Sequence, residues 1–430
     1  MRSRAASALP LAVAAAAALL GPACAGPCKT LEADLRALRD APGPVTAAPH
    51  ARVQIPFTVA NRLLADALQP PPEIAIPLAR LGPLSQVISD VRAIPREVTL
   101  GPAATPGRVH ASVRVELADR AGELLSVRAS GDVAPTLERA AGEDGALVIA
   151  FDATQLSRLE PELGPRAAEE LGGRLAARLP DAVRPPRFLI DRVASAVLEE
   201  AIDQGYRLLN GTLSPRLRER MRLRVELPDV PLARVDLAST QDAIALDVFT
   251  TLPVRTGVVP APPVPDAILV QIAGDTATQA ANWGIAHGRL PPRYTRKLKP
   301  ARDGAYVPHV EWRAGDPDRP LAVHMFRVEG GCAHFIVGLR PRVEVVDGKV
   351  RAWIDNRRLE HADGPLVLEL LAYTKALVER STSSKKQGPG SVRFAVGKRE
   401  LTTRLLRAEI AGDELRAAMA LEIGPAHRAP

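Results

Sequence analysis

The chain has 430 residues, more than the roughly 250 to 300 at which one hydrophobic core stops growing, so we expect two domains. Hydrophobic residues make up 46% and charged residues 24%, which predicts a folded rather than a disordered chain. The net charge of +7 favours an anionic membrane surface as a partner, but no block of Lys and Arg with interleaved aromatics occurs, which argues against nucleic-acid binding.

The N-terminus shows the three-part pattern of a secretory signal peptide at residues 1–25. Arg2 and Arg4 precede an apolar run over 8–20, and the small residues around Cys24 form a cleavage site. The apolar run is too short to be a transmembrane helix. We expect cleavage after residue 25 and export to the periplasm or the medium, and the alternative is a lipoprotein anchored to the membrane through Cys24.

Two thiols remain after this cleavage. Cys28 lies in an N-terminal segment at 26–52, and Cys332 lies in the second half of the chain. Disulfides persist in exported compartments, so one prediction is a bridge between these two residues. The other is a free Cys28 near the new terminus and a buried Cys332, because the sequence alone does not give their separation.

One stretch of the chain occurs twice. Residues 53–68 combine an extended Val-Gln-Ile lead with an amphipathic helix, and the same three letters return 217 residues later at 270–272. The apolar positions that follow also correspond, which indicates an internal duplication. The pattern predicts a strand followed by a helix at the start of each half.

The two copies differ in side-chain size. Leu63 and Leu64 of the first copy correspond to Ala280 and Ala281 of the second. Smaller side chains at these positions would widen a cavity that a ligand fills, or would let the helix pack closer to a sheet. Both interpretations are compatible with the sequence.

The first half continues with strands and a helical region. Apolar and polar residues alternate in the strand segments, and a broad apolar stripe runs along a long helix predicted over 187–209. A shorter helix is predicted over 164–179. The predicted strands are 96–100, 108–117, 124–133, 146–153, 220–227, 232–238 and 243–252.

A proline-rich and nearly uncharged linker at 253–266 joins the two halves. We expect it to be extended and stiff, and to cross a covered surface. The second half repeats the order of elements in shorter form, with a long helix predicted over 366–380. Its predicted strands are 305–311, 321–328, 333–346, 349–354, 392–396, 401–410 and 414–423.

This order of elements, found twice around a proline-rich linker, resembles the two-domain tubular lipid-binding (TULIP) superfamily. The nearest likeness is to bactericidal/permeability-increasing protein and its relatives, over about 53–423. The resemblance implies an α+β fold with two tandem similar domains at 53–252 and 267–425. Each would be a highly curved antiparallel sheet wrapped around a long helix, and the two would share a central sheet.

The resemblance further implies an exported lipid-binding or lipid-transfer protein that holds acyl chains in apolar tubes. The expected partner is a phospholipid or another diacyl lipid, and no cofactor is implied. Burial of an acyl chain would be tight, because each buried methylene contributes about 0.8 kcal/mol. The residues expected to contact the chains are Val59, Leu63, Val193, Val197, Leu198, Ile285, Leu370, Leu371 and Leu377.

The sequence carries no recognised catalytic motif. Gly-x-Ser-x-Gly, His-Glu-x-x-His and P-loop patterns are absent, so we expect a binding protein rather than an enzyme. Hairpin pairing could join His324, Cys332 and His334 at a metal, but plain strand residues with a structural cysteine are the favoured interpretation, and we expect no metal site. The alternative functions are a non-enzymatic envelope scaffold that binds a partner and a hydrolase with an unrecognised site.

Overall fold

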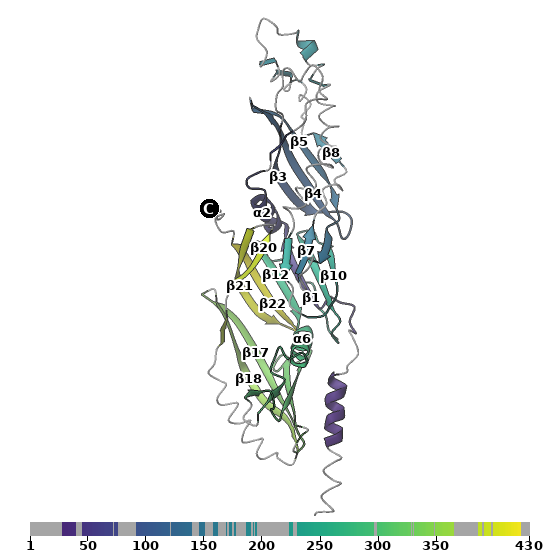
Figure 1. Cartoon of the computed structure of the whole chain (residues 1–430), viewed down its shortest axis with the longest axis vertical. Helices are drawn as coiled ribbons and strands as arrows, with labels where there is room; N and C mark the ends of the chain where they lie inside the picture. The colour runs from purple at the N-terminus through teal and green to yellow at the C-terminus, as the bar shows by residue number, and fades with distance from the viewer. Residues whose placement is uncertain are drawn as a thin grey trace, which may run out of the picture.

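The computed structural model of the chain is elongated, and its sheets follow one another along the long axis (Figure 1). The structure describes residues 28–39, 45–71, 73–75, 92–120, 122–139, 146–150, 158–161, 169, 172–173, 176–177, 186–190, 192, 194–195, 223–226, 230–295, 299–327, 329, 331–347, 349–364, 386–388, 391–396 and 399–422.

The central element is a ten-stranded sheet built from distant parts of the chain. Two of its inner strands, β1 and β12, carry the two copies of Val-Gln-Ile and pair antiparallel, with Val53 directly opposite Val270. The strand order is β10 (Leu232–Ser239), β11 (Ala243–Thr250), β1 (Ala51–Pro56), β12 (Ala267–Ala273), β22 (Glu414–Glu422), β21 (Arg399–Ala411), β20 (Ser391–Val396), β9 (Leu223–Glu226), β7 (Ala146–Ala150) and β6 (Thr136–Arg139).

Two five-stranded antiparallel sheets flank the central sheet, one on either side of it along the molecule (Figure 1). The upper sheet contains β2 (Ile74–Ala75), β3 (Arg92–Pro102), β4 (Val109–Asp119), β5 (Gly122–Val133) and β8 (Arg158–Pro161). The lower sheet contains β15 (Val307–Trp312), β16 (Leu321–Arg327), β17 (Ala333–Val346), β18 (Lys349–Asp363) and β19 (Lys386–Gly388). A small ribbon pairs β13 (Arg293–Tyr294) with β14 (Pro300–Ala301).

The expected fold class, an α+β fold with a curved sheet wrapped around a long helix in each half, is wrong. The described residues form mostly antiparallel sheets, and α2 (Phe57–Ala67) and α6 (Gly274–Ala286) have only 11 and 13 residues. Of the helix predicted over 187–209, the described residues 187–190, 192 and 194–195 are helical, and the helix predicted over 366–380 lies outside the described part of the chain. A broad apolar stripe indicates that a helix is buried, but it does not indicate which elements surround the helix.

Both copies of the repeated stretch form a strand followed directly by a helix, as predicted. The apolar face of α2 packs into the main hydrophobic core, where Val59, Leu63 and Leu64 lie against residues of the upper and central sheets. No helix among the described residues is both long and apolar enough to cross a bilayer.

An asparagine on each helix holds the first long strand of the neighbouring sheet. Asn61 of α2 donates to Leu100 O at 3.0 Å and accepts from Leu100 N at 2.6 Å. Asn282 of α6 makes the same pair of bonds with Val310, each at 2.8 Å. Each asparagine side-chain amide bonds both the N–H and the C=O of one strand residue, as a neighbouring strand would. It therefore links the helix to the sheet at a fixed register.

A separate helix at residues 28–39, called here the N-terminal helix, is attached to the lower sheet. Cys28 and Cys332 form a disulfide with a Cα–Cα distance of 5.2 Å, which is the first of the two alternatives left open by the sequence. Leu31 and Leu35 are buried in a small cluster with Val307 and Phe326 of the lower sheet. The helix is therefore held by one covalent bond and one apolar contact.

We predict that Asn61→Ala and Asn282→Ala each lower the free energy of unfolding by about 1–3 kcal/mol, because each leaves a strand N–H and C=O without their partner. Urea denaturation measures the change. Gln279→Ala on α6 is the control, since Gln279 is partly exposed and such substitutions usually change stability by less than about 0.5 kcal/mol. An asparagine variant no less stable than this control would show that the amide bonds do not hold the sheets.

Candidate functional site

One face of the central sheet carries a row of incompletely buried aliphatic side chains. Pairing places Ile272 opposite Leu415, and Leu415 opposite Ile410, so these side chains point to the same side of the sheet. All members are partly exposed although they lie on inner strands. The row, called here the central stripe, consists of Val53, Val270, Ile272, Leu405, Ile410, Leu415 and Met419.

The opposite face of the sheet is covered by the linker. Gln54 Nε2 donates to Ala261 O at 2.9 Å, and Gln271 Nε2 donates to Val259 O at 3.0 Å. Glu414 Oε1 accepts from Val259 N at 2.6 Å. These side chains bond the linker backbone across β1, β12 and β22, so the linker crosses a surface that it covers. The partly exposed Val, Ile, Leu and Met residues of these strands lie on the central stripe's face.

The same polar network joins the two copies of the repeat. Gln54 Nε2 lies 3.2 Å from Gln271 Oε1, and Gln271 Nε2 lies 3.0 Å from Glu414 Oε2. Gln271 is fully buried, Gln54 is 2% exposed and Glu414 is 4% exposed. Buried polar groups are tolerated when their hydrogen bonds are made, so this network favours one placement of the linker.

Charged and titratable groups near β1 are also paired. Arg52 makes two bonds to Asp247, at 2.6 and 2.7 Å, and this pairing raises the pKa of Arg52. His50 is 1% exposed, and its Nδ1 accepts a hydrogen bond from Thr250 N at 2.9 Å. Burial lowers the pKa of His50. The imidazole is therefore held neutral beside the start of the linker.

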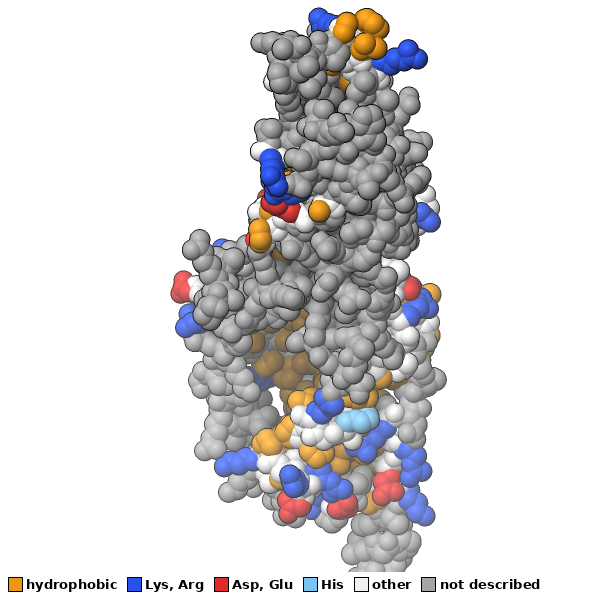
Figure 2. Space-filling model, turned by 45° about the horizontal axis from the view of Figure 1, so that its top comes forward, with side chains coloured by type: hydrophobic (Ala, Val, Ile, Leu, Met, Phe, Trp, Pro, Cys, Tyr) orange, Lys and Arg blue, Asp and Glu red, His pale blue; other side chains and the backbone are white. Residues whose placement is uncertain are grey.

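The two repeated helices differ in the burial of the side chains at matching positions. On α2, Leu63 and Leu64 are 8% and 7% exposed and belong to the core. On α6, Ala280 and Ala281 at the corresponding positions remain partly exposed. The smaller side chains of α6 are thus not buried as their larger counterparts on α2 are. Figure 2 shows a hollow in the molecule with hydrophobic side chains at its bottom.

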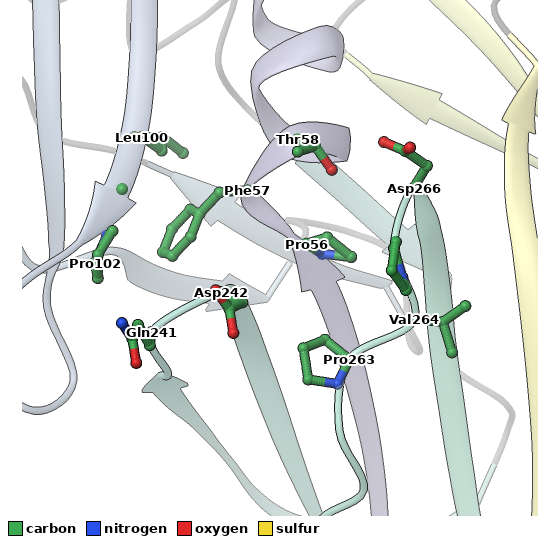
Figure 3. Close-up of a pocket in the computed structure, with 12 residues that line it drawn as sticks. Pro56, Phe57, Thr58, Leu100, Pro102, Gln241, Asp242, Pro263, Val264 and Asp266 are labelled. Atoms are coloured by element: carbon green, nitrogen blue, oxygen red, sulfur yellow. The ribbon is translucent and has the colours of Figure 1, made fainter.

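A second concave feature is a pocket of about 460 Å³ at the start of α2 (Figure 3). Its inner wall holds Phe57 and Leu100, which are 8% and 5% exposed. Asp242 and Asp266 lie at the rim with exposed side chains. The remaining lining residues are Pro56, Thr58, Gly101, Pro102, Gln241, Pro263, Val264 and Pro265.

Four segments meet at this pocket, and the end of the linker is one of them. Phe57 N donates to Asp242 O at 3.0 Å, which ties the start of α2 to the turn between β10 and β11. Asp266 lies 3.5 Å from Arg62 in an exposed ion pair. The mainly apolar wall suits an apolar group, and the rim carboxylates disfavour an anionic one.

Only three of the nine residues expected to contact lipid are described. Val59 and Leu63 lie in the packed core under α2, and Ile285 is 9% exposed on α6. The other six lie outside the residues whose side chains the structure describes, and they are Val193, Val197, Leu198, Leu370, Leu371 and Leu377.

The suggested metal cluster is only partly assembled. His324 Nδ1 and His334 Nε2 lie 3.3 Å apart, but Cys332 is joined to Cys28 in the disulfide. Within the described ranges, no group of three His, Cys, Asp or Glu residues is arranged to hold a metal ion.

Sequence reasoning missed the polar network under the linker. Its signal was present, because a glutamine stands between aliphatic residues in both copies of the repeat, at Gln54 and Gln271. A polar residue kept inside two apolar strands indicates a buried hydrogen-bond partner. The partners, Val259 and Ala261, lie in a linker without helix or strand, so local patterns could not identify them.

The sequence matches no protein-family model and no curated protein. Solved structures with weak similarity include P47 of Clostridium botulinum E1, with 8% identity, a TM-score of 0.41, and coverage of 87% of this chain and 99% of that chain. P47 from Clostridium botulinum A2 has 6% identity and a TM-score of 0.39, covering 88% and 98%. A lipopolysaccharide binding protein has 11% identity and a TM-score of 0.24, covering 88% and 100%.

We predict that Gln271→Ala loosens the linker. The change removes donors to Val259 O and Glu414 in a buried site, at a cost of about 1–3 kcal/mol in the free energy of unfolding. Limited proteolysis followed by mass spectrometry should find faster cleavage within 251–266. Gln279→Ala serves again as the matched glutamine control. Equal cleavage rates in both variants would show that the network does not hold the linker.

Proposed function

We propose that the protein binds a lipid, or a similar long apolar ligand, along the central stripe and beside α6. The observation that carries this proposal is the partial exposure of Ile272, Ile410 and Leu415 on inner strands of a ten-stranded sheet. Aliphatic residues at such positions are normally covered. A bound acyl chain would cover them, and removing the apolar surfaces of both the chain and the stripe from water would stabilise the complex.

The chemistry of the central stripe supports an uncharged, flexible ligand. Its seven members are Val, Ile, Leu or Met, and Met419 can adapt its side chain to an irregular partner. Each methylene that leaves water contributes about 0.8 kcal/mol, so a chain covering the stripe gains several kcal/mol. A phospholipid or another diacyl lipid is the ligand class that we propose, in a binding rather than a catalytic role.

We also propose that the protein is exported, with the periplasm or the medium as its location. The Cys28–Cys332 disulfide supports this proposal, because such bonds persist in oxidising compartments. Residues 1–25, with the expected signal peptide and the alternative anchor at Cys24, lie outside the described part of the chain.

The test is lipid loading of the purified protein. We expect organic extraction and mass spectrometry to recover about one lipid or more per chain, and a fluorescent phospholipid to be taken up. Ala280→Trp should reduce uptake about tenfold or more, because an indole adds bulk on α6 beside the proposed ligand. Ala65→Trp on the exposed side of α2 is the matched control.

Thermal unfolding followed by circular dichroism must show that both tryptophan variants stay cooperatively folded. If folded Ala280→Trp takes up as much lipid as the wild-type protein, α6 is not part of the proposed site. Absence of bound lipid together with absence of uptake would overturn the function itself.

A further inference from the structure

Four of the eight histidines of the chain lie on one face of the lower sheet. His309 on β15 is directly opposite His324 on β16. Ile336 on β17 is opposite His324 on one side and His361 of β18 on the other. His334 on β17 is opposite Phe326 of β16. One histidine from each of four adjacent strands therefore points to the same side. This set, His309, His324, His334 and His361, is called here the histidine ladder.

The rings of the histidine ladder are in contact with one another. His324 is central, because its Nδ1 lies 3.3 Å from His334 Nε2 and its Nε2 lies 3.1 Å from Glu311 Oε2. The ring centres of His309 and His324 are 6.1 Å apart, and those of His334 and His361 are 5.4 Å apart. Protons on neighbouring rings of this set would place like charges side by side.

Burial makes protonation of two of these rings costly. His309 is 5% exposed and His324 is 7% exposed. Burial, followed by the charge of His324, lowers the pKa of His309 from 6.5 to about 4. The same two causes, and then His361, lower the pKa of His334 to about 4. At neutral pH both imidazoles are therefore uncharged.

The N-terminal helix covers this face. Leu31 and Leu35 pack against Val307 and Phe326, and the Phe326 ring stacks on His334 with centres 4.2 Å apart. The charged and titratable groups that face the histidine ladder come from every element around it. They are Asp34 and Arg39 of the N-terminal helix, Arg255 of the linker, Glu311 and Arg313 at β15, and Asp363 of β18.

We propose that the N-terminal helix is an acid-releasable cover, which leaves the lower sheet when the histidine ladder takes up protons and stays attached through the Cys28–Cys332 disulfide. Only protons are exchanged in this step, and no covalent bond changes. Release exposes Val307 and Phe326 on the sheet. The inference does not depend on lipid binding, because it concerns a different sheet.

The direction of the pH effect follows from the shifted groups. Between about pH 6.5 and about pH 4, His309 and His334 bind protons when uncovered but not when covered. Docking of the helix therefore weakens as the pH falls through this window, and the full effect is reached below pH 4. Above pH 6.5 both states are neutral and docking is strongest.

Hydrogen exchange of the full-length oxidised protein at pH 7.5 and pH 4.5 tests the proposal. After correction for intrinsic exchange, we expect the protection of backbone amides in 28–39 to fall about tenfold or more at the lower pH. The protection of amides in β4 and β5 should change less than about twofold. Protection of 28–39 that is equal at both pH values would overturn the proposal, as would an equal loss throughout the sheets.

Charge variants of the N-terminal helix distinguish titration of the histidine ladder from acid unfolding of the whole protein. The carboxylate of Asp34 raises the pKa of His334, and the guanidinium of Arg39 lowers that of His309. Asp34→Asn should therefore enlarge the loss of protection at pH 4.5, and Arg39→Gln should reduce it. Glu32→Gln, also exposed, is the matched control. Shifts of the same sign in the Asp34 and Arg39 variants would contradict the mechanism.

Discussion

The pairing of β1 with β12 is the contact on which the rest of the structure depends. Val53 opposite Val270 brings together residues that are far apart in the chain, and both flanking strands, β11 and β22, take their register from this pair. Gln54, Gln271 and Glu414 then bond the linker over one face. Long-range antiparallel pairing with a satisfied polar network leaves little freedom for a different register.

This arrangement makes the two faces of the sheet unequal. The face under the linker uses buried amides and carboxylates, which require fixed partners. The other face carries the aliphatic central stripe, and α2 packs against part of it, next to Val53, Val270 and Met419. The side chains of α2 and α6 differ in size at matching positions. α2 fills its space with Leu63 and Leu64. Ala280 and Ala281 at the matching positions of α6 remain partly exposed.

The N-terminal helix is joined to the lower sheet by other kinds of interaction. A disulfide and two leucines hold it, and beneath it lie imidazoles that are neutral only while the pH stays above their lowered pKa values. The linker network of the central sheet is built differently, from amides and from Glu414 bonded to Arg416 at 3.0 Å.

The sequence by itself determined the local elements: the repeated strand and helix, the alternating strands, and the short β17–β18 turn at Asp347. Periodicity reports which faces of an element are apolar, and that information is local. Tertiary structure alone decided that β1 meets β12, that Asn61 and Asn282 bond to strand backbones, that Cys28 reaches Cys332, and that four histidines share one face. The expected sheet around a long helix failed for the same reason, because an apolar stripe requires a covering partner without specifying which one.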